Sequence, residues 1–467
     1  MDFREIWYLI TTLNILTVLT FLLTLLAIAH MLSQRHKPSS MRAWFVVILL
    51  MPYIGIPLYV IFSGRKIEKI IKSKKQIELK RIYEIKEKLD SSIERLLRSN
   101  GIAGAIGNNS IYICKDGVEA YHKLMQLINE AKESIYITTY ILKDDEVTRE
   151  IIKALAKRAK EGVDVKLLID SIGSLRLELF PFMLKPLKEA GGEYHFFMSI
   201  LKKPLSAKLN LRNHRKMIII DNKKVMSGGM NIAKEYMSPF YHPGLWVDLS
   251  FILHGKASLH YYEIFKYDWE FETNTPLAPI KNNLPLKVGN SITQVVPSGP
   301  DVERDALYEA ILAGIFEAKE KIWILSPYFI PDDALLDALK VAKHKGVDVK
   351  IITAKISDHI FVDIAKRGYL RELYSEGVDI LFYKNKMVHA KAILIDDDIG
   401  VMGSSNFDIR SFFYNFEVVS FCYTKEDINN LKEWIERLFS DCDRGMKDTK
   451  KIGILMENIF KLIAPVL

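Results

Sequence analysis

The sequence predicts an α/β protein with two fused, homologous sheet domains in a pseudo-two-fold arrangement, preceded by an N-terminal transmembrane helical hairpin. The first observation is a duplicated pattern, H-x-K-x-x-x-x-D, which begins at His214 and again at His389. An asparagine follows at the same distance in both copies, at Asn231 and Asn406. The second observation is that helical and strand-like segments alternate in each half, which favours a sheet covered by helices. The third is a pair of long apolar segments near the N-terminus.

The two apolar segments are residues 6–29 and 43–63, and neither contains a charged side chain. Each reaches the length of about 20 residues that crosses a bilayer, so we expect two transmembrane helices. Pro52, Gly55 and Pro57 interrupt the second segment, and a kinked or re-entrant path is the alternative. A cleaved signal peptide is a rival interpretation of the first segment, but the residues before it lack a basic region.

A basic stretch follows the second apolar segment: residues 65–80 contain seven Lys and Arg. Basic residues accumulate on the cytoplasmic side of membranes, so we expect the two domains to face the cytoplasm and the protein to be a multi-pass membrane protein. Arg35, Lys37 and Arg42 between the two apolar segments weaken this orientation. The stretch either lies on anionic headgroups or forms a solvated helix.

The halves repeat beyond the duplicated pattern. Residues 130–137 resemble residues 317–324, and each copy continues through an acidic pair, a helical segment and an apolar strand to its own H-x-K strand. The predicted organisation is a membrane hairpin at 1–64, a basic linker helix at 65–105, a first domain at 106–270, a second domain at 285–445 and an amphipathic C-terminal helix at 446–467.

The C-terminal segment shows apolar residues at helical spacing, with Lys451 and Lys461 beside them. Such a helix either lies in the membrane interface or packs on the second domain, and the sequence leaves both open. The apolar positions are Ile452, Leu455, Met456, Ile459, Phe460 and Ile463.

The duplicated pattern suits chemistry on a phosphodiester. Residues at i and i+2 of a strand share a face, so each His lies beside its Lys. Lysines bind phosphate oxygens, one neutral imidazole can attack phosphorus, and a second imidazolium can protonate the leaving alcohol. This scheme requires no metal and no cofactor. A lone His on a strand is usually a packing residue, but the duplication argues against that interpretation here.

Asp221 and Asp396 are the last residues of the two patterns. They are included among the candidate catalytic residues because they are part of the motif. Each lies an odd number of residues after its His, so on a continuous strand its side chain would point to the opposite face. Their neighbours have turn character, as in Asp221-Asn222 and Asp396-Asp397. The local sequence therefore favours turn or ion-pair formation for both carboxylates.

Composition is that of a globular protein, with 26% charged and 49% hydrophobic residues and a formal net charge of +8. A basic protein suits nucleic acid or an anionic membrane as partner, and the apolar segments favour the membrane. Cys114, Cys422 and Cys442 are scattered, without metal-binding spacing, and their odd number argues against a disulfide framework.

These motifs together resemble the phospholipase D superfamily, and more narrowly bacterial cardiolipin synthases, over nearly the whole chain. The resemblance rests on the stretches 210–216, 227–232 and 246–248 in the first half, and on 389–391, 403–411 and 415–417 in the second. It also includes the N-terminal leader.

The resemblance implies a role for each residue of the site. His214 would be the nucleophile that forms a phosphatidyl-histidine, and His389 would protonate the departing alcohol and deprotonate the incoming one. Asp248 and Glu417 would orient the two imidazoles. The remaining residues, Lys216, Lys391, Asn231 and Asn406, would hold the phosphate oxygens.

The resemblance further implies transfer of a phosphatidyl group from one phosphatidylglycerol to another, giving cardiolipin and glycerol. The alternative is a phospholipase D that hydrolyses or exchanges headgroups of other phospholipids such as phosphatidylethanolamine. The expected partners are phosphatidylglycerol and anionic lipids of the bacterial inner membrane, without nucleic acid, and a homo-oligomer is possible. A nuclease and a non-enzymatic membrane scaffold are the remaining rivals.

Overall fold

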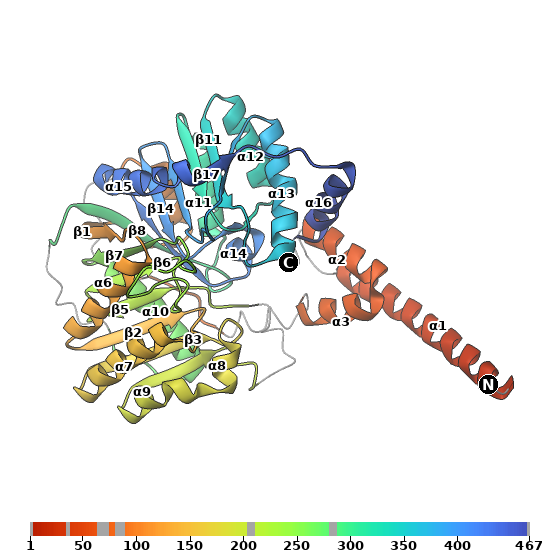
Figure 1. The fold of residues 1–467 in the computed structure, drawn as a ribbon, viewed down its shortest axis with the longest axis horizontal. Helices are drawn as coiled ribbons and strands as arrows, with labels where there is room; N and C mark the ends of the chain where they lie inside the picture. The colour runs from red at the N-terminus through yellow and green to blue at the C-terminus, as the bar shows by residue number, and fades with distance from the viewer. Residues whose placement is uncertain are drawn as a thin grey trace.

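The computed structural model describes residues 3–33, 38–62, 74–79, 89–202, 211–279 and 287–464. Two α/β halves form the body of the protein, and three N-terminal helices project from one side of it (Figure 1). The first half is drawn in orange to green, and the second in cyan to blue. The helices that project are α1 Phe3–Ser33, α2 Pro38–Leu50 and α3 Pro52–Phe62.

One continuous sheet of fifteen strands runs through both halves of the described chain. In the first half its strands are β1 Ile106–Ile113, β2 Ser134–Thr139, β3 Asp164–Asp170, β4 Glu193–Phe197, β5 Met217–Ile220, β6 Lys224–Gly228 and β7 Ser250–His254. In the second half they are β8 Ser291–Ser298, β9 Lys321–Leu325, β11 Asp348–Ala354, β12 Asp379–Tyr383, β13 Ala392–Ile395, β14 Ile399–Gly403, β16 Glu417–Cys422 and β17 Cys442–Arg444. A separate pair joins β10 Phe329–Ile330 to β15 Phe407–Asp408.

The two halves meet where β1 pairs antiparallel with β8, with Ile106 opposite Thr293. Outward from this junction the first half runs β1-β7-β6-β5-β2-β3-β4, and the second runs β8-β16-β14-β13-β9-β11-β12, followed by β17. The same order on both sides confirms the predicted pair of homologous α/β domains in pseudo-two-fold relation. Both H-x-K motifs lie immediately before equivalent strands, β5 and β13. The predicted boundaries at 106–270 and 285–445 stay predictions.

Helices cover both faces of the sheet and bury its apolar side chains. One outer core lies under the first-half helices and another under the second-half helices, while a central core combines residues of both halves. The covering helices are α6 Gly117–Glu130, α7 Glu146–Lys160, α10 Ser258–Thr273, α11 Ala306–Glu317, α12 Asp333–His344, α13 Ile360–Ser375 and α15 Lys425–Glu436. Short helical turns are α8 Leu175–Leu179, α9 Lys185–Glu189 and α14 Ile409–Phe413.

The acidic pairs of the repeat start equivalent helices in the two halves. The Asp145 carboxylate accepts a hydrogen bond from the Thr148 amide at the start of α7, at 2.8 Å. The Asp332 carboxylate accepts one from the Leu335 amide at the start of α12, at 3.1 Å. Both are N-caps, which satisfy amides that have no partner within the helix.

The prediction of a second transmembrane helix is wrong, because residues 43–63 do not form one long helix. The chain breaks at Met51, between α2 and α3, which have 13 and 11 residues. At 1.5 Å per residue neither covers the roughly 30 Å of a bilayer core. Pro52 causes the break, since it lacks the amide hydrogen that would continue α2. Residues 14–33 of α1 are long and apolar enough to span.

The linker and the C-terminal segment are described in part. Most of the predicted linker helix at 65–105 lies outside the described residues; within it, 74–79 are not helical and α5 spans Ser92–Ser99. The C-terminal helix α16, Lys451–Ile463, packs along α13, where Phe460 stacks on Phe361 with ring centroids 5.6 Å apart.

Helix α16 packs on the second half, yet most of its apolar positions remain exposed, so the structure is compatible with both interpretations of this helix. Polar contacts help to hold it, since Arg371 Nε donates to Glu457 Oε2 at 2.8 Å. The exposed apolar side chains on it are Ile452, Ile454, Leu455, Met456, Ile459 and Leu462. The side chain of Ile463 lies outside the described part of the helix.

Candidate active site

The backbone brings the two H-x-K motifs together by reciprocal contacts between the halves. The His214 amide donates to the carbonyl of Phe416 at 2.9 Å, and the His389 amide donates to the carbonyl of Val247 at 2.7 Å. These are parallel bridges that join a segment of one half to a segment of the other. Each histidine is therefore fixed next to the acidic residue of the opposite half.

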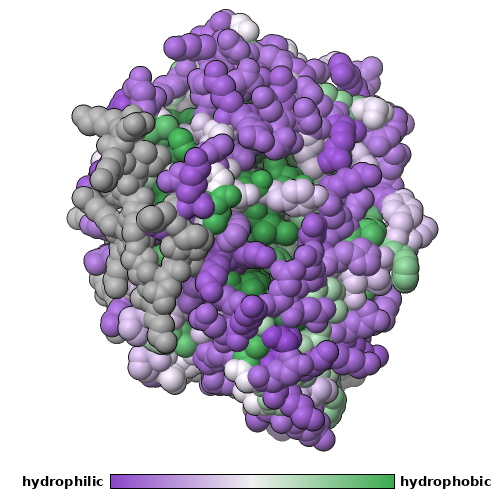
Figure 2. Space-filling model, turned by 90° about the vertical axis from the view of Figure 1, so that its left-hand side faces the viewer, coloured by the Kyte–Doolittle hydropathy of each residue, from purple (hydrophilic) through white to green (hydrophobic). Residues whose placement is uncertain are grey.

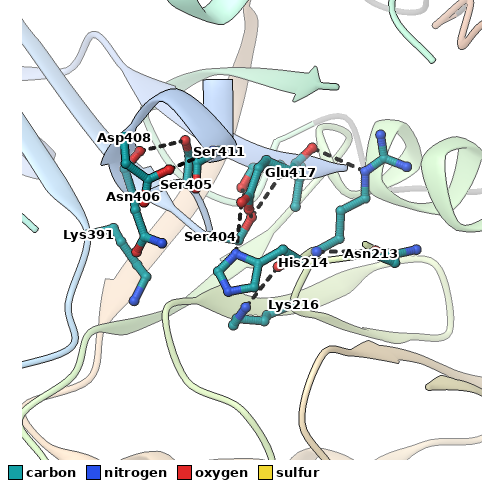
Figure 3. Close-up of polar contacts among 12 residues, drawn as sticks. Asn213, His214, Lys216, Lys391, Ser404, Ser405, Asn406, Asp408, Ser411 and Glu417 are labelled. Carbon is teal, nitrogen blue, oxygen red and sulfur yellow. Dashed lines mark hydrogen bonds and ion pairs between the residues drawn. The ribbon is translucent and has the colours of Figure 1, made fainter. Parts of the chain in front are cut away.

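His214 is oriented by Glu417, the first residue of β16 in the second half. The Nδ1 atom of His214 lies 2.8 Å from Glu417 Oε1, and both side chains are buried. The hydroxyl of Ser404 donates to the other carboxylate oxygen of Glu417. Figure 3 shows this chain of contacts, with Lys216 below the His214 ring and Lys391 and Asn406 to its left. A carboxylate on one ring nitrogen fixes the tautomer and leaves Nε2 for chemistry.

His389 is oriented by Asp248, just before β7 in the first half. Its Nδ1 atom lies 2.7 Å from Asp248 Oδ2, and the Leu249 amide donates to Asp248 Oδ1 at 2.7 Å. A Cβ at Gly229 would lie 2.2 Å from Asp248 Oδ1, so the first half needs glycine beside its carboxylate. The second half has Ser404 at its carboxylate instead.

The two lysines lie with the histidines, as their i, i+2 spacing predicts. Lys216 Nζ donates to the carbonyl oxygen of His214 at 2.8 Å, and Lys391 Nζ lies 2.9 Å from Nδ1 of His389. Both side chains are buried. Each ammonium also acts electrostatically on the histidine of the other half, so the four groups form one site.

Burial controls the protonation of this site. It lowers the pKa of His214 to about 4; Lys216 and Lys391 act in the same direction, and Glu417 opposes them. Burial and the two lysines also lower the pKa of His389 to about 4. Burial lowers the pKa of Lys216 to about 7 and that of Lys391 to about 8. Burial thus favours neutral imidazoles at pH 7 and holds the pKa of both lysines well below the usual range of an ammonium group.

Aromatic rings surround both imidazoles. Tyr140 meets the His214 ring edge-on, with centroids 5.0 Å apart. Tyr236 and Trp246 lie 5.2 and 5.6 Å from the ring of His389, and Tyr328 lies 6.4 Å from it. Trp246 belongs to a stretch that the family resemblance includes, and Tyr140 and Tyr328 recur in the repeat. Nothing in the sequence indicated Tyr236.

The two asparagines of the repeat have different environments. The side-chain oxygen of Asn231 accepts a hydrogen bond from the Ile141 amide at 3.1 Å. The oxygen of Asn406 is buried and has no hydrogen-bond partner among the described residues. Asn406 lies close to Lys391 in Figure 3. An amide oxygen accepts hydrogen bonds, so a hydroxyl of a ligand can complete it, whereas a phosphate oxygen requires the Nδ2 donor of the same side chain.

Asp221 and Asp396 do not lie with the histidines, since they follow the opposite ends of β5 and β13. Asp221 accepts hydrogen bonds from the amides of Lys132, Glu133 and Ser134. Asp396 makes the equivalent contacts with the amides of residues 319–321. Both residues have positive φ, near 50°. These contacts agree with the expected turn role and correct the assignment of both carboxylates to the catalytic set.

A buried ion network that sequence reasoning missed lies behind His214. Arg215 Nη1 donates to Asp268 at 2.6 Å and its Nη2 donates to Asp301 at 2.9 Å. Lys74 bonds to both carboxylates, at 2.7 Å to Asp268. Arg215 Nε also donates to the carbonyl oxygen of Glu417 at 3.1 Å. The sequence offered no signal for these long-range pairs.

The arrangement offers two oriented imidazoles and two ammonium groups to one substrate group. Such a site can form and break a phosphorus–oxygen bond through a covalent histidine intermediate. The described residues include no group of three or more His, Cys, Asp or Glu side chains that could hold a metal ion. The site residues as a set stay predictions.

Comparison with known families identifies the same two halves. The family described as "Cardiolipin synthase, PLD-like domain" matches residues 124–269 and 311–439, more than half of the chain. The chain belongs to this family. Residues 22–64 match a second family, described as "Phospholipase D-nuclease N-terminal". The recognised resemblance is thereby confirmed, and family membership indicates an enzyme.

Relatives in the cardiolipin synthase family are similar over nearly the full chain. The major cardiolipin synthase ClsA of Bacillus subtilis strain 168 is 33% identical, covering 97% of this chain and 99% of that protein. A cardiolipin synthase of Oceanobacillus iheyensis is 34% identical with the same coverage. The structure of phosphatidylserine synthase from Haemophilus influenzae Rd KW20 matches with a TM-score of 0.61, covering 81% of this chain and all of that chain at 14% identity, which supports the fold.

Proposed function

We propose that the protein is a cardiolipin synthase that uses two molecules of phosphatidylglycerol and releases glycerol. The observation that carries the proposal is the pair of buried histidines, each held by a carboxylate of the opposite half, in a chain of this family. The relatives named cardiolipin synthase support the reaction, whereas a phospholipase D hydrolysing other lipids is not favoured.

In the first step, Nε2 of His214 attacks phosphorus of one phosphatidylglycerol. The bond from phosphorus to the glycerol oxygen breaks, and His389 supplies the proton that glycerol carries away. The phosphodiester anion adds negative charge between Lys216 and Lys391, which favours the protonated form of His389. Asn231 and Asn406 complete the contacts to the phosphate oxygens. Asp221 and Asp396 hold their strands and take no part in the chemistry.

In the second step, a hydroxyl of the second phosphatidylglycerol attacks the phosphatidyl group on His214. Neutral His389 accepts the hydroxyl proton, the phosphorus–nitrogen bond breaks, and cardiolipin leaves. One diester bond replaces another, so the exchange requires no nucleotide and no cofactor. The rings of Tyr140, Tyr236 and Trp246 around the two imidazoles limit the access of water to the intermediate.

The enzyme acts at the bacterial inner membrane, with anionic lipids as substrates and both halves on the cytoplasmic side. The apolar helix α1 and the relatives named cardiolipin synthase, whose product is a membrane lipid, support this location. The seven basic residues of 65–80 support the orientation.

The test is to incubate the purified full chain with phosphatidylglycerol alone, in the presence of a chelator and without nucleotide, and to measure cardiolipin and glycerol together. We expect equal amounts of both, and loss of both in His214→Ala but not in the exposed control His122→Ala. Phosphatidic acid as the main product would instead make the protein a phospholipase D. Full turnover by His214→Ala would exclude His214 as the nucleophile.

A further inference from the structure

The start of α2 lies against the second catalytic half. Arg42 Nη2 lies 3.4 Å from Asp333 Oδ2 at the beginning of α12, and α2 also packs on α16. In a two-span hairpin, the start of the second span would lie across the bilayer from the catalytic halves, about 30 Å away. The contacts instead place the end of α1 and the beginning of α2 on the catalytic side (Figure 1).

Helix α3 folds back along α2 and reaches the last turn of α1. Trp44, at the middle of α2, and Tyr59, in the second half of α3, have ring centroids 5.7 Å apart. Fifteen residues of continuous helix would separate them by about 22 Å. The hydroxyl of Tyr59 also lies 2.8 Å from Nδ1 of His30 in the last turn of α1. Helix α3 therefore runs back beside α2 toward the end of α1.

The tip of this pair is apolar and satisfies its own backbone. The Met51 amide donates to the carbonyl of Val47, and the Ile54 amide donates to the carbonyl of Met51, both at 3.0 Å. A Cβ at Gly55 would lie 2.6 Å from the Val47 oxygen, so only glycine permits this close packing. Leu50, at the tip, is 73% exposed. A turn with internal hydrogen bonds and an apolar surface can enter hydrocarbon.

We propose that α1 crosses the bilayer once, and that α2 and α3 form a re-entrant pair that dips into the membrane and returns to the catalytic side. The partner of the exposed tip is the hydrocarbon of the bilayer. This inference goes beyond the proposed reaction, and it does not depend on which lipid is the substrate.

The distribution of charge agrees with one span and not with two. Two spans would place Arg35 and Lys37 on the outer side and the basic stretch 65–80 on the inner side, which divides the positive charge. One span with a re-entrant pair places both clusters on the cytoplasmic side, as the positive-inside rule requires. It places the N-terminal end, where Arg4 and Glu5 carry opposite charges, on the outer side.

The surfaces of the body agree with this placement. Figure 2 shows the face turned away from α1–α3, which is mainly hydrophilic apart from a small hollow near its centre. The exposed apolar side chains of α16 lie on the other side, on a helix that contacts α2. Both helices thus lie at the same membrane interface.

The experiment is cysteine labelling with a membrane-impermeant maleimide in spheroplasts that produce the full chain, before and after permeabilisation. The single variants are Glu5→Cys, Ser33→Cys and, as a reference on the catalytic body, Lys160→Cys. Wild type, with its own three cysteines, sets the background. We expect Glu5→Cys to react in intact spheroplasts, and the other two to react only after permeabilisation.

A two-span hairpin would give the reverse pattern for the first two variants, with Ser33→Cys reacting from outside while Lys160→Cys does not. That result would overturn the re-entrant pair. Protection of Glu5→Cys would overturn the crossing by α1, unless Ser33→Cys and Lys160→Cys both react from outside. In that case the re-entrant pair would stand and the cytoplasmic orientation would be wrong. Labelling requires no activity, so its outcome is independent of the proposed reaction.

Discussion

At the scale of single residues, the defining contact is the exchange of carboxylates between the halves. His214 of the first half is held by Glu417 of the second, and His389 of the second by Asp248 of the first. The two pairs differ in their surroundings, because Ser404 bonds to Glu417 whereas Gly229 lies beside Asp248. Because the geometry around the two rings is similar, kinetic measurements are needed to decide which histidine is the nucleophile and which is the acid.

The carboxylates provide that distinction. Glu417→Gln preserves shape but loses the charge that supports His214, and we expect transfer to fall by roughly 10²- to 10⁴-fold. Asp248→Asn should lower transfer similarly with phosphatidylglycerol. With phosphatidyl-4-nitrophenol, whose leaving group needs no proton, Asp248→Asn should retain the burst of nitrophenol while Glu417→Gln loses it. The opposite pattern would exchange the roles of the histidines, and exposed Glu426→Gln serves as the control.

The lowered pKa values predict the pH dependence of kcat/KM. Protonation of His214, whose pKa is about 4, removes the nucleophile, so activity should fall as pH decreases through about 4. The first step also needs a proton on His389, whose pKa is about 4 in the free protein, so kcat/KM should fall as pH rises above about 4. It should fall more steeply through about 7 and about 8, where Lys216 and Lys391 lose their protons. Glycerol release across this interval measures both limbs. Rates that stay constant from neutral pH to well above it would contradict the role of the lysines.

Much of the site followed from the sequence, because the motif is local. The i, i+2 spacing correctly predicted that Lys216 lies beside His214. The odd spacing and the turn-like neighbours of Asp221 predicted its role in a turn. The family motifs pointed to Asp248 and Glu417 as orienting groups. The sequence did not show which carboxylate binds which histidine. That pairing depends on backbone bridges between segments that lie 141 and 203 residues apart in the chain.

At the scale of elements, two segments show what hydropathy and charge patterns omit. Residues 43–63 are uniformly apolar, and the break at Met51 follows from the missing amide of Pro52 and from packing at Gly55. Lys74 lies in a basic stretch that reads as a solvated helix, yet it is buried between Asp268 and Asp301. Composition could not distinguish this lysine from its exposed neighbour Lys75.

We therefore expect Lys74→Ala to destabilise the protein. Its removal leaves two buried carboxylates with Arg215 as their shared cation, a change that costs about 3–5 kcal/mol for comparable buried pairs. Thermal unfolding in detergent measures the effect. Exposed Lys75→Ala is the matched control and should change the free energy of unfolding by less than about 0.5 kcal/mol. Equal melting temperatures for the two variants would show that the network does not need Lys74.

At the scale of the whole molecule, the repeat predicted two domains, and the structure joins them into one sheet. β1 pairs with β8, and a central core draws apolar residues from both halves. The duplication was visible in the sequence, but the junction was not, because β1 and β8 precede the repeated motifs and carry no signature. The halves are better regarded as one cooperative unit.

This continuity predicts a single unfolding transition for the catalytic body. Separating the halves would break the β1–β8 ladder and expose the shared core, so neither half should persist when the other unfolds. Circular dichroism and tryptophan fluorescence during urea unfolding should give coincident curves. The control Lys153→Gln, at an exposed position of α7 in the first half, should leave the curves coincident. Two separate transitions would mean that the halves are independent.

The exchanged carboxylates also restrict how lipids reach and leave the site. If the halves moved apart along their interface, both histidines would lose their orienting groups at once, and Nε2 of each would no longer be directed at phosphorus. A catalytic cycle that opened the protein in this way would have to rebuild two buried histidine–carboxylate hydrogen bonds at every turnover. Substrate exchange must therefore use movements of side chains and loops at the rim of the site, while the interface between the halves stays closed from the first bond cleavage to the last.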